Sequence, residues 1–175
     1  MSREIVRVNR APVLTLWAAV VAERAGYDHD EALSLGKALA GLNAQAKGRS
    51  LGIFKPAEKP EAARKVRPGE EFRVALLGRP VPAKRTESGV RALNKDRVVD
   101  PAGVERYLES KFGEKLDSVV KAMTALAKSL KPDELADRAY ALYERFRPAI
   151  PEGVRGWGAE GELDVALVRS LAGER

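Results

Sequence analysis

Apolar residues recur at steps of three and four between residues 104 and 130, and this spacing constrains the fold more than any other feature of the sequence. An α-helix repeats every 3.6 residues, so side chains at these steps share one helical face. The residues that follow the spacing are Val104, Tyr107, Leu108, Phe112, Leu116, Val119, Val120, Met123, Leu126 and Leu130. Asp100 and Pro101 suit the cap and first position of the helix, and Gly113 can kink or divide it.

Two further helices are predicted after residue 130. The first begins at Pro132 and stops at Pro148, and its predicted core face consists of Leu135, Ala139, Leu142, Tyr143 and Phe146. A glycine-rich loop around Trp157 follows, and residues 163–171 predict a short closing helix. The C-terminal part of the chain is therefore expected to be a helical lobe.

The N-terminal segment, residues 1–54, predicts a helical hairpin. Its first helix opens at Ala11 and Pro12 and ends at Gly26, because glycine tolerates the left-handed conformation that closes many helices. Asp28 or Asp30 then caps a second helix that ends between residues 43 and 48. Two helices joined by about four residues form such a hairpin.

Residues 72–99 predict a small β-meander between the two helical parts. Strands are expected at 72–77, 89–93 and 97–99, whereas Pro80 and Pro82 argue against a central strand between them. Residues 55–71 contain three prolines, many charges and little to bury, so they are predicted to be a basic flexible linker or arm. The expected fold is mainly α with a small β element (α+β). Its segments are 1–54, 55–71 and 72–175, which together form one compact unit or two subdomains.

Positive charge is concentrated in the middle of the chain. Residues 43–99 contain 14 Lys or Arg against 6 Asp or Glu, whereas residues 1–42 contain 5 of each and residues 100–175 contain 12 basic and 14 acidic residues. A clustered basic region attracts polyanions, because each cation near a phosphate releases condensed counterions. The alternative is a solubilising surface.

Eight basic residues are the candidate nucleic-acid contacts: Lys47, Arg49, Arg64, Lys65, Arg67, Arg79, Lys84 and Arg85. They occupy the end of the hairpin, the basic arm and a predicted β-turn, from which they can contact phosphates. Phe72 is the only aromatic residue between Phe54 and Tyr107. Because single strands are commonly bound by stacking on aromatic rings, this composition favours duplex DNA.

Ala22 and Gly26 are spaced as in many helix-turn-helix proteins, which read DNA with the second helix. Here the start of that helix carries Asp28, Asp30 and Glu31, which phosphates would repel. An ordinary helical hairpin is therefore the favoured interpretation.

Other functions find less support in the sequence. The chain has no cysteine and a single histidine, His29, so no metal, cofactor or catalytic residue is predicted. A signal peptide and a membrane-spanning run are not recognised, and a cytoplasmic location is expected. The leading prediction is a non-enzymatic nucleic-acid-binding protein. The alternatives are a protein-interaction or homo-oligomerisation module that uses the C-terminal helices and Trp157, and an enzyme that acts on a phosphorylated metabolite in a basic cleft.

Overall fold

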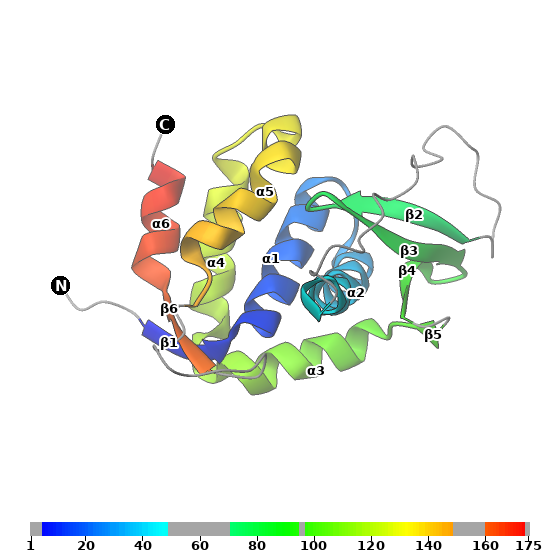
Figure 1. The fold of residues 1–175 in the computed structure, drawn as a ribbon, viewed down its shortest axis with the longest axis horizontal. Helices are drawn as coiled ribbons and strands as arrows, with labels where there is room; N and C mark the ends of the chain where they lie inside the picture. Colours follow the sequence, from blue (N-terminus) through cyan, green and yellow to red (C-terminus); the bar gives the residue numbers. More distant parts are fainter. Residues whose placement is uncertain (1–4, 49–70, 95–96, 149–159, 174–175) are drawn as a thin grey trace.

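The computed structural model describes residues 5–48, 71–94, 97–148 and 160–173. These segments form a body of helices with a four-stranded antiparallel sheet at one end and a two-stranded sheet at the other (Figure 1). The predicted fold class, mainly α with a small β element, is confirmed. The predicted arm at residues 55–71 lies outside the described residues except for Glu71, so the division of the chain at this arm stays a prediction.

The predicted helical hairpin is present as α1 (Arg10–Arg24) and α2 (His29–Gly48). Gly26 has a φ of 113° in the turn, a conformation that glycine adopts without the steric penalty of a side chain. The Asp28 side chain accepts a hydrogen bond from the backbone N–H of Glu31 at 2.8 Å, and the Glu31 side chain accepts one from the N–H of Asp28 at 3.0 Å. This reciprocal pair is a capping box, and it fixes the start of α2.

The two helices of the hairpin approach each other closely at Gly36. A Cβ atom at this position would lie 2.5 Å from the carbonyl oxygen of Thr15 and 3.0 Å from the backbone nitrogen of Ala19. Real contacts are almost never so short, so only glycine fits between the helices here. The resulting interface is largely buried and extends to Trp17, whose Nε1 donates a hydrogen bond to the carbonyl of Ala139 at 2.9 Å.

The predicted meander is a four-stranded sheet in the order β2 (Glu71–Leu76), β3 (Arg79–Thr86), β4 (Gly89–Asn94) and β5 (Arg97–Val98). Leu77 and Gly78 join the first two strands with φ angles of 50° and 77°, the positive values that a type I′ turn requires. The inward side chains of the sheet pack on the helices. They include Phe72, Val74, Leu76, Val81, Ala83, Val90 and Ala92.

The expectation that Pro80 and Pro82 exclude a central strand is wrong, because both lie inside β3 between β2 and β4. The register explains why they are tolerated. Successive amides of an antiparallel strand point alternately to its two neighbours, and the missing amides of these prolines fall on the β4 side. There β3 pairs with β4 only from Ala83 to Thr86, so the prolines remove no hydrogen bond from the ladder.

Side chains of α2 bind the backbone of β4 directly. Glu31 accepts a hydrogen bond from the N–H of Val90 at 2.8 Å, and the hydroxyl of Ser34 accepts one from the N–H of Ala92 at 2.7 Å. The same hydroxyl donates to the carbonyl of Val99 at 3.1 Å. Helix α2 is thus joined to the sheet by polar contacts in addition to apolar packing.

The long predicted helical segment is divided at Gly113, as expected. It forms α3 (Pro101–Phe112), the short 3₁₀ helix η1 (Gly113–Lys115) and α4 (Leu116–Lys128). Helix α5 (Pro132–Phe146) buries the five residues assigned to its core face. Phe146 makes an edge-to-face contact with Trp17 at 5.3 Å between ring centroids, which joins α5 to α1.

The two ends of the described chain meet in a sheet that the sequence did not predict. Strand β1 (Ile5–Asn9) pairs antiparallel with β6 (Glu160–Asp164), and α6 (Val165–Gly173) follows and lies beside α4 (Figure 1). The predicted closing helix therefore begins two residues later than expected. Its first two predicted residues, Leu163 and Asp164, belong to β6.

Candidate nucleic-acid interface

The structure describes three of the eight predicted contacts in full. Arg49, Arg64, Lys65 and Arg67 lie outside the described residues, and Lys47 belongs to the last turn of α2. The other three predicted contacts all lie on β3. The sheet is therefore the part of the predicted interface that the structure describes.

Arg79, Lys84 and Arg85 do not form one cluster on β3. Alternate residues of a strand face opposite sides, so Lys84 lies on the face opposite to Arg79 and Arg85. Arg79 and Arg85 share a face but are six residues apart, which is roughly 20 Å along a strand. The strand therefore does not bring its three predicted contacts together at one point.

The register brings other basic residues to the face of Lys84. Lys84 lies opposite Glu71 on β2 and opposite Arg91 on β4, and Arg73 occupies the same face two residues after Glu71. Arg91 is only 7% exposed, and its guanidinium donates to the carbonyl of Val90 at 2.9 Å. This face thus holds three basic residues and one acidic residue. Arg73 is not among the contacts predicted from the sequence, although its alternation with apolar Phe72 and Val74 places it on the outer face of a strand.

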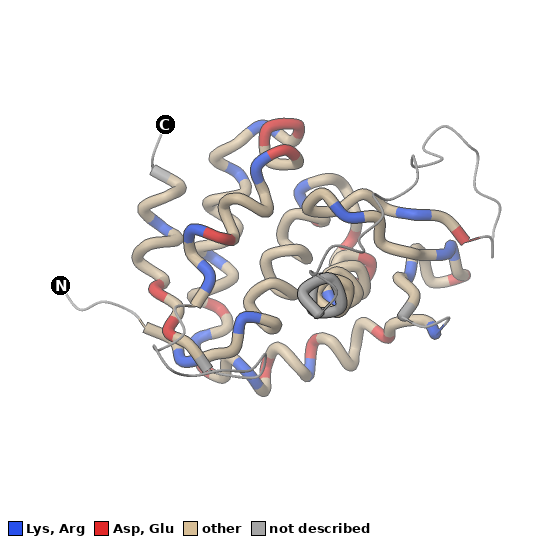
Figure 2. Tube along the Cα trace, in the orientation of Figure 1, with Lys and Arg blue, Asp and Glu red and all other residues tan. Residues whose placement is uncertain are grey.

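The strands β2 to β5 and the turns between them carry an excess of positive charge. Residues 71–94 and 97–99 include six Lys or Arg and two Asp or Glu. Within the described segments, Arg73, Lys84, Arg85 and Arg97 form no ion pair. Basic positions recur along these strands in the charge-coloured trace (Figure 2). Arg73, Arg85 and Arg97 are exposed and Lys84 is half-buried, so their charges are available to an external anion.

The aromatic ring in the sheet is not available for base stacking. Phe72 is half-buried on the inner face and packs against the core. Helix α2 is not positioned to enter a DNA groove either, because most of its described length is buried against α1, α3 and the sheet. The favoured interpretation of the hairpin as a structural element thus agrees with its packing.

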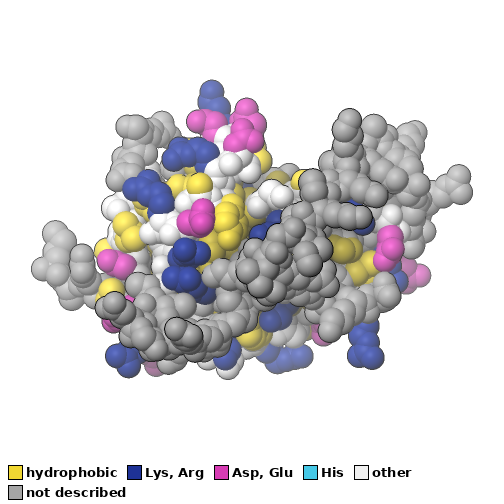
Figure 3. All heavy atoms as spheres, in the orientation of Figure 1, with side chains coloured by type: hydrophobic (Ala, Val, Ile, Leu, Met, Phe, Trp, Pro, Cys, Tyr) yellow, Lys and Arg dark blue, Asp and Glu magenta, His cyan; other side chains and the backbone are white. Residues whose placement is uncertain are grey.

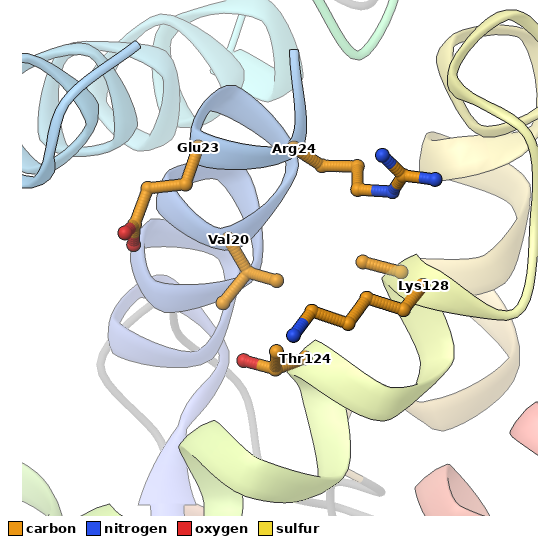
Figure 4. A pocket seen from close by; sticks show the side chains of 6 residues that line it. Val20, Glu23, Arg24, Thr124 and Lys128 are labelled. Carbon is orange, nitrogen blue, oxygen red and sulfur yellow. The ribbon is translucent and has the colours of Figure 1, made fainter. Parts of the chain in front are cut away.

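A groove of about 370 Å³ lies between the C-terminal ends of α1 and α4. It is lined by Val20, Glu23, Arg24, Thr124, Ala127 and Lys128. Arg24 and Lys128 extend in different directions from its two walls (Figure 4). Arg24 donates to the carbonyl of Leu130 at 3.3 Å, which supports a structural role in satisfying the end of α4. The two positive side chains of the groove therefore do not converge on a single binding point.

His29 is an exposed residue at the start of α2. Its Nδ1 is 3.8 Å from a carboxylate oxygen of Glu23 on α1, and its Nε2 is 3.6 Å from one of Glu105 on α3. Each carboxylate faces a different nitrogen of the ring, so one metal ion could not be bound by both carboxylates and the imidazole together. Among the residues that the structure describes, no group of three or more His, Cys, Asp or Glu side chains could hold a metal ion.

The alternative protein-interaction surface is described only in part, because Trp157 lies outside the described residues. The apolar side chains of α5 are used in the core, and Ile5 and Val98 are the exposed large apolar residues of the described segments. Charges of both signs and small apolar areas are mixed on the face shown in Figure 3. None of the described helices is long and apolar enough to span a membrane.

Comparisons with models of protein families, with curated proteins and with solved structures find no match to this chain.

Proposed function

We propose that the protein binds nucleic acid, and duplex DNA in preference to single strands, through the basic residues of its central region. The observation that carries the proposal is a group of three cations on β2 to β5 that form no ion pair among the described residues: the exposed Arg73 and Arg97 and the half-buried Lys84. They belong to the same stretch, 43–99, that holds the whole positive excess of the chain. The absence of cysteine fits a cytoplasmic location, which is part of the proposal.

The preference for a duplex follows from what the described sheet offers. Base stacking on a single strand needs exposed aromatic rings, whereas phosphate contacts need only cations at suitable spacing. The sheet exposes cations, and its aromatic residue Phe72 packs inward. Binding of this type is electrostatic, depends steeply on salt and reads little sequence.

The proposal is tested by fluorescence anisotropy with a random-sequence duplex and the matching single strand at several salt concentrations. The wild-type protein is expected to bind the duplex more tightly, with a log–log salt slope of about 0.9 for every phosphate contacted. The variant Arg73→Gln/Lys84→Gln/Arg97→Gln should bind more weakly and with a shallower slope. A second variant, Arg64→Ala/Lys65→Ala/Arg67→Ala, tests the predicted arm in the same way.

A matched control separates local contacts from net charge. Lys121→Gln/Lys128→Gln/Arg138→Gln removes three exposed cations from α4 and α5, outside the basic region. It should leave affinity close to the wild-type value. The proposal is refuted if the wild-type protein fails to bind the duplex even at low salt. Equal losses of affinity in the sheet and control variants would show that binding depends on net charge and not on the positions of the sheet cations.

A further inference from the structure

Two lysines converge on one tyrosine ring where α2 packs against α3. The Nζ of Lys37 on α2 lies 3.8 Å from the centroid of the Tyr107 ring, and the Nζ of Lys111 on α3 lies 6.0 Å from the same centroid. Lys111 follows Tyr107 by four residues, so both project from the same side of α3. Two ammonium groups from different helices are thereby held around one aromatic side chain.

The described residues do not balance these two charges. Neither lysine forms an ion pair with an acidic side chain in the part of the chain that the structure describes. Burial lowers the pKa of Lys37, and the nearby charge of Lys111 lowers it further. The Tyr107 ring offers its negative face to Lys37, but a second cation at the same ring is repelled by the first. An anion bound between the two lysines would therefore be attracted by both charges.

The cluster lies close to the end of the sheet where β5 carries Arg97, one of the three cations of the proposed interface. Lys37 follows Ser34 by three residues on α2, and the Ser34 hydroxyl binds the backbone of Ala92 on β4 and of Val99 just after β5. Helix α3 begins directly after these strands and packs against α2, which it crosses (Figure 1). From Pro101 to Tyr107 it advances roughly 9 Å. One bound polyanion can therefore reach both Arg97 on β5 and the lysine cluster.

We propose that Lys37 and Lys111 form a phosphate-binding site, with the Tyr107 ring holding the Lys37 ammonium in place. As a contact to the backbone of a duplex, the site rests on the proposed function and extends the interface from the sheet onto α2 and α3. A free phosphate group on a small molecule presents the same oxygens, so the experiment has to separate the two sources.

The site is tested with two probes on the same set of variants. Inorganic phosphate is titrated into ¹⁵N-lysine-labelled protein while the ammonium resonances are followed by NMR, and a labelled duplex is titrated by anisotropy across a range of salt. Lys37→Gln/Lys111→Gln is compared with Lys121→Gln/Lys128→Gln, which removes the same charge from α4. Thermal unfolding of each variant verifies that it remains folded.

The proposal predicts saturable phosphate-dependent shifts at Lys37 and Lys111 that are absent at Lys121. It also predicts that the Lys37/Lys111 variant shows a salt slope shallower by about 0.9, the value for one lost phosphate contact. If the wild type binds the duplex and this variant binds it equally well, the site is refuted while the proposed function stands. If phosphate binds at the two lysines but the duplex does not bind, the site stands for a small phosphorylated ligand and the proposed function fails. Binding of neither probe refutes both.

Discussion

The close approach of α1 and α2 predicts opposite effects for the same substitution at two glycines of one helix. In Gly36→Ala the new methyl group would meet the carbonyl oxygen of Thr15 at 2.5 Å, whereas in Gly41→Ala it would meet nothing within 4 Å. Ordinary contact begins at 3.4 Å. Because both atoms at Gly36 are backbone atoms that no rotamer change can move away, the helices would have to separate by about 1 Å.

The magnitudes follow from two opposing effects. Alanine stabilises a helix interior over glycine by about 1 kcal/mol, and this gain should appear almost undiminished in Gly41→Ala. Overpacking a buried interface costs about 1–3 kcal/mol or more, and the short backbone contacts at Gly36 place this site at the upper end. We therefore expect Gly36→Ala to be about 2 kcal/mol less stable than the wild type, which makes the two variants differ by about 3 kcal/mol.

Urea unfolding followed by far-ultraviolet circular dichroism and tryptophan fluorescence measures this difference. The Gly41→Ala variant serves as the control for helix propensity, because it carries the same change on the same helix. Equal stability of the two variants, or a more stable Gly36→Ala, would refute the close contact between α1 and α2.

Three further predictions concern single groups. Burial raises the pKa of Tyr143 to about 12 from 10.0, so its contribution to stability is complete below pH 10 and is lost as pH rises through 12. Urea unfolding compared between pH 9 and 12 should show a loss of about 2 kcal/mol that is absent in Tyr143→Phe. Lys111→Gln removes a repelling charge and should raise the pKa of Lys37, measured by NMR titration of its side chain, and an unchanged pKa would contradict the shared ring contact. Ser34→Ala leaves the buried N–H of Ala92 without its acceptor, so it should lower the free energy of unfolding by about 1–3 kcal/mol and speed hydrogen exchange at Ala92, whereas Ser170→Ala on α6 should do neither.

Local sequence signals were sufficient for most of the helical fold. Pro101 and Pro132 mark helix starts because proline suits a position whose N–H has no partner within the helix, and Gly26 marks an end because its left-handed φ is easily adopted. The core face of α5 followed from spacing alone, since one helical stripe had to be buried. These features depend only on residues within a few positions of each other.

The unpredicted parts of the fold depend on distant pairing. Strand β6 has the sequence Glu160–Asp164 with a glycine and three acidic residues, so it has little intrinsic preference for a strand and is fixed by its pairing with β1. The prolines of β3 are tolerated only because β4 pairs with the other half of the strand, a fact of register.

The candidate site was predictable in charge but not in geometry. The basic excess of residues 43–99 is visible in the sequence, yet the separation of Lys84 from Arg79 and Arg85 depends on the alternation of a strand that the prolines argued against. Lys37 and Lys111 are more than seventy positions apart along the chain, and only the packing of α2 on α3 brings both to Tyr107. No local pattern around either lysine indicates the other.

The contacts from α2 to β4 also determine where the sheet can grow. An exposed strand edge is a template onto which another chain can add, and this is a common start of aggregation. Glu31 and Ser34 occupy the outward amides of Val90 and Ala92 that an added strand would need, and β5 pairs with the remainder of β4 at Leu93 and Asn94. Strand β5, the other edge of the described sheet, has only two residues, so strand addition is directed to β2. There Arg73 places a positive charge that discourages a second copy of the same edge from pairing.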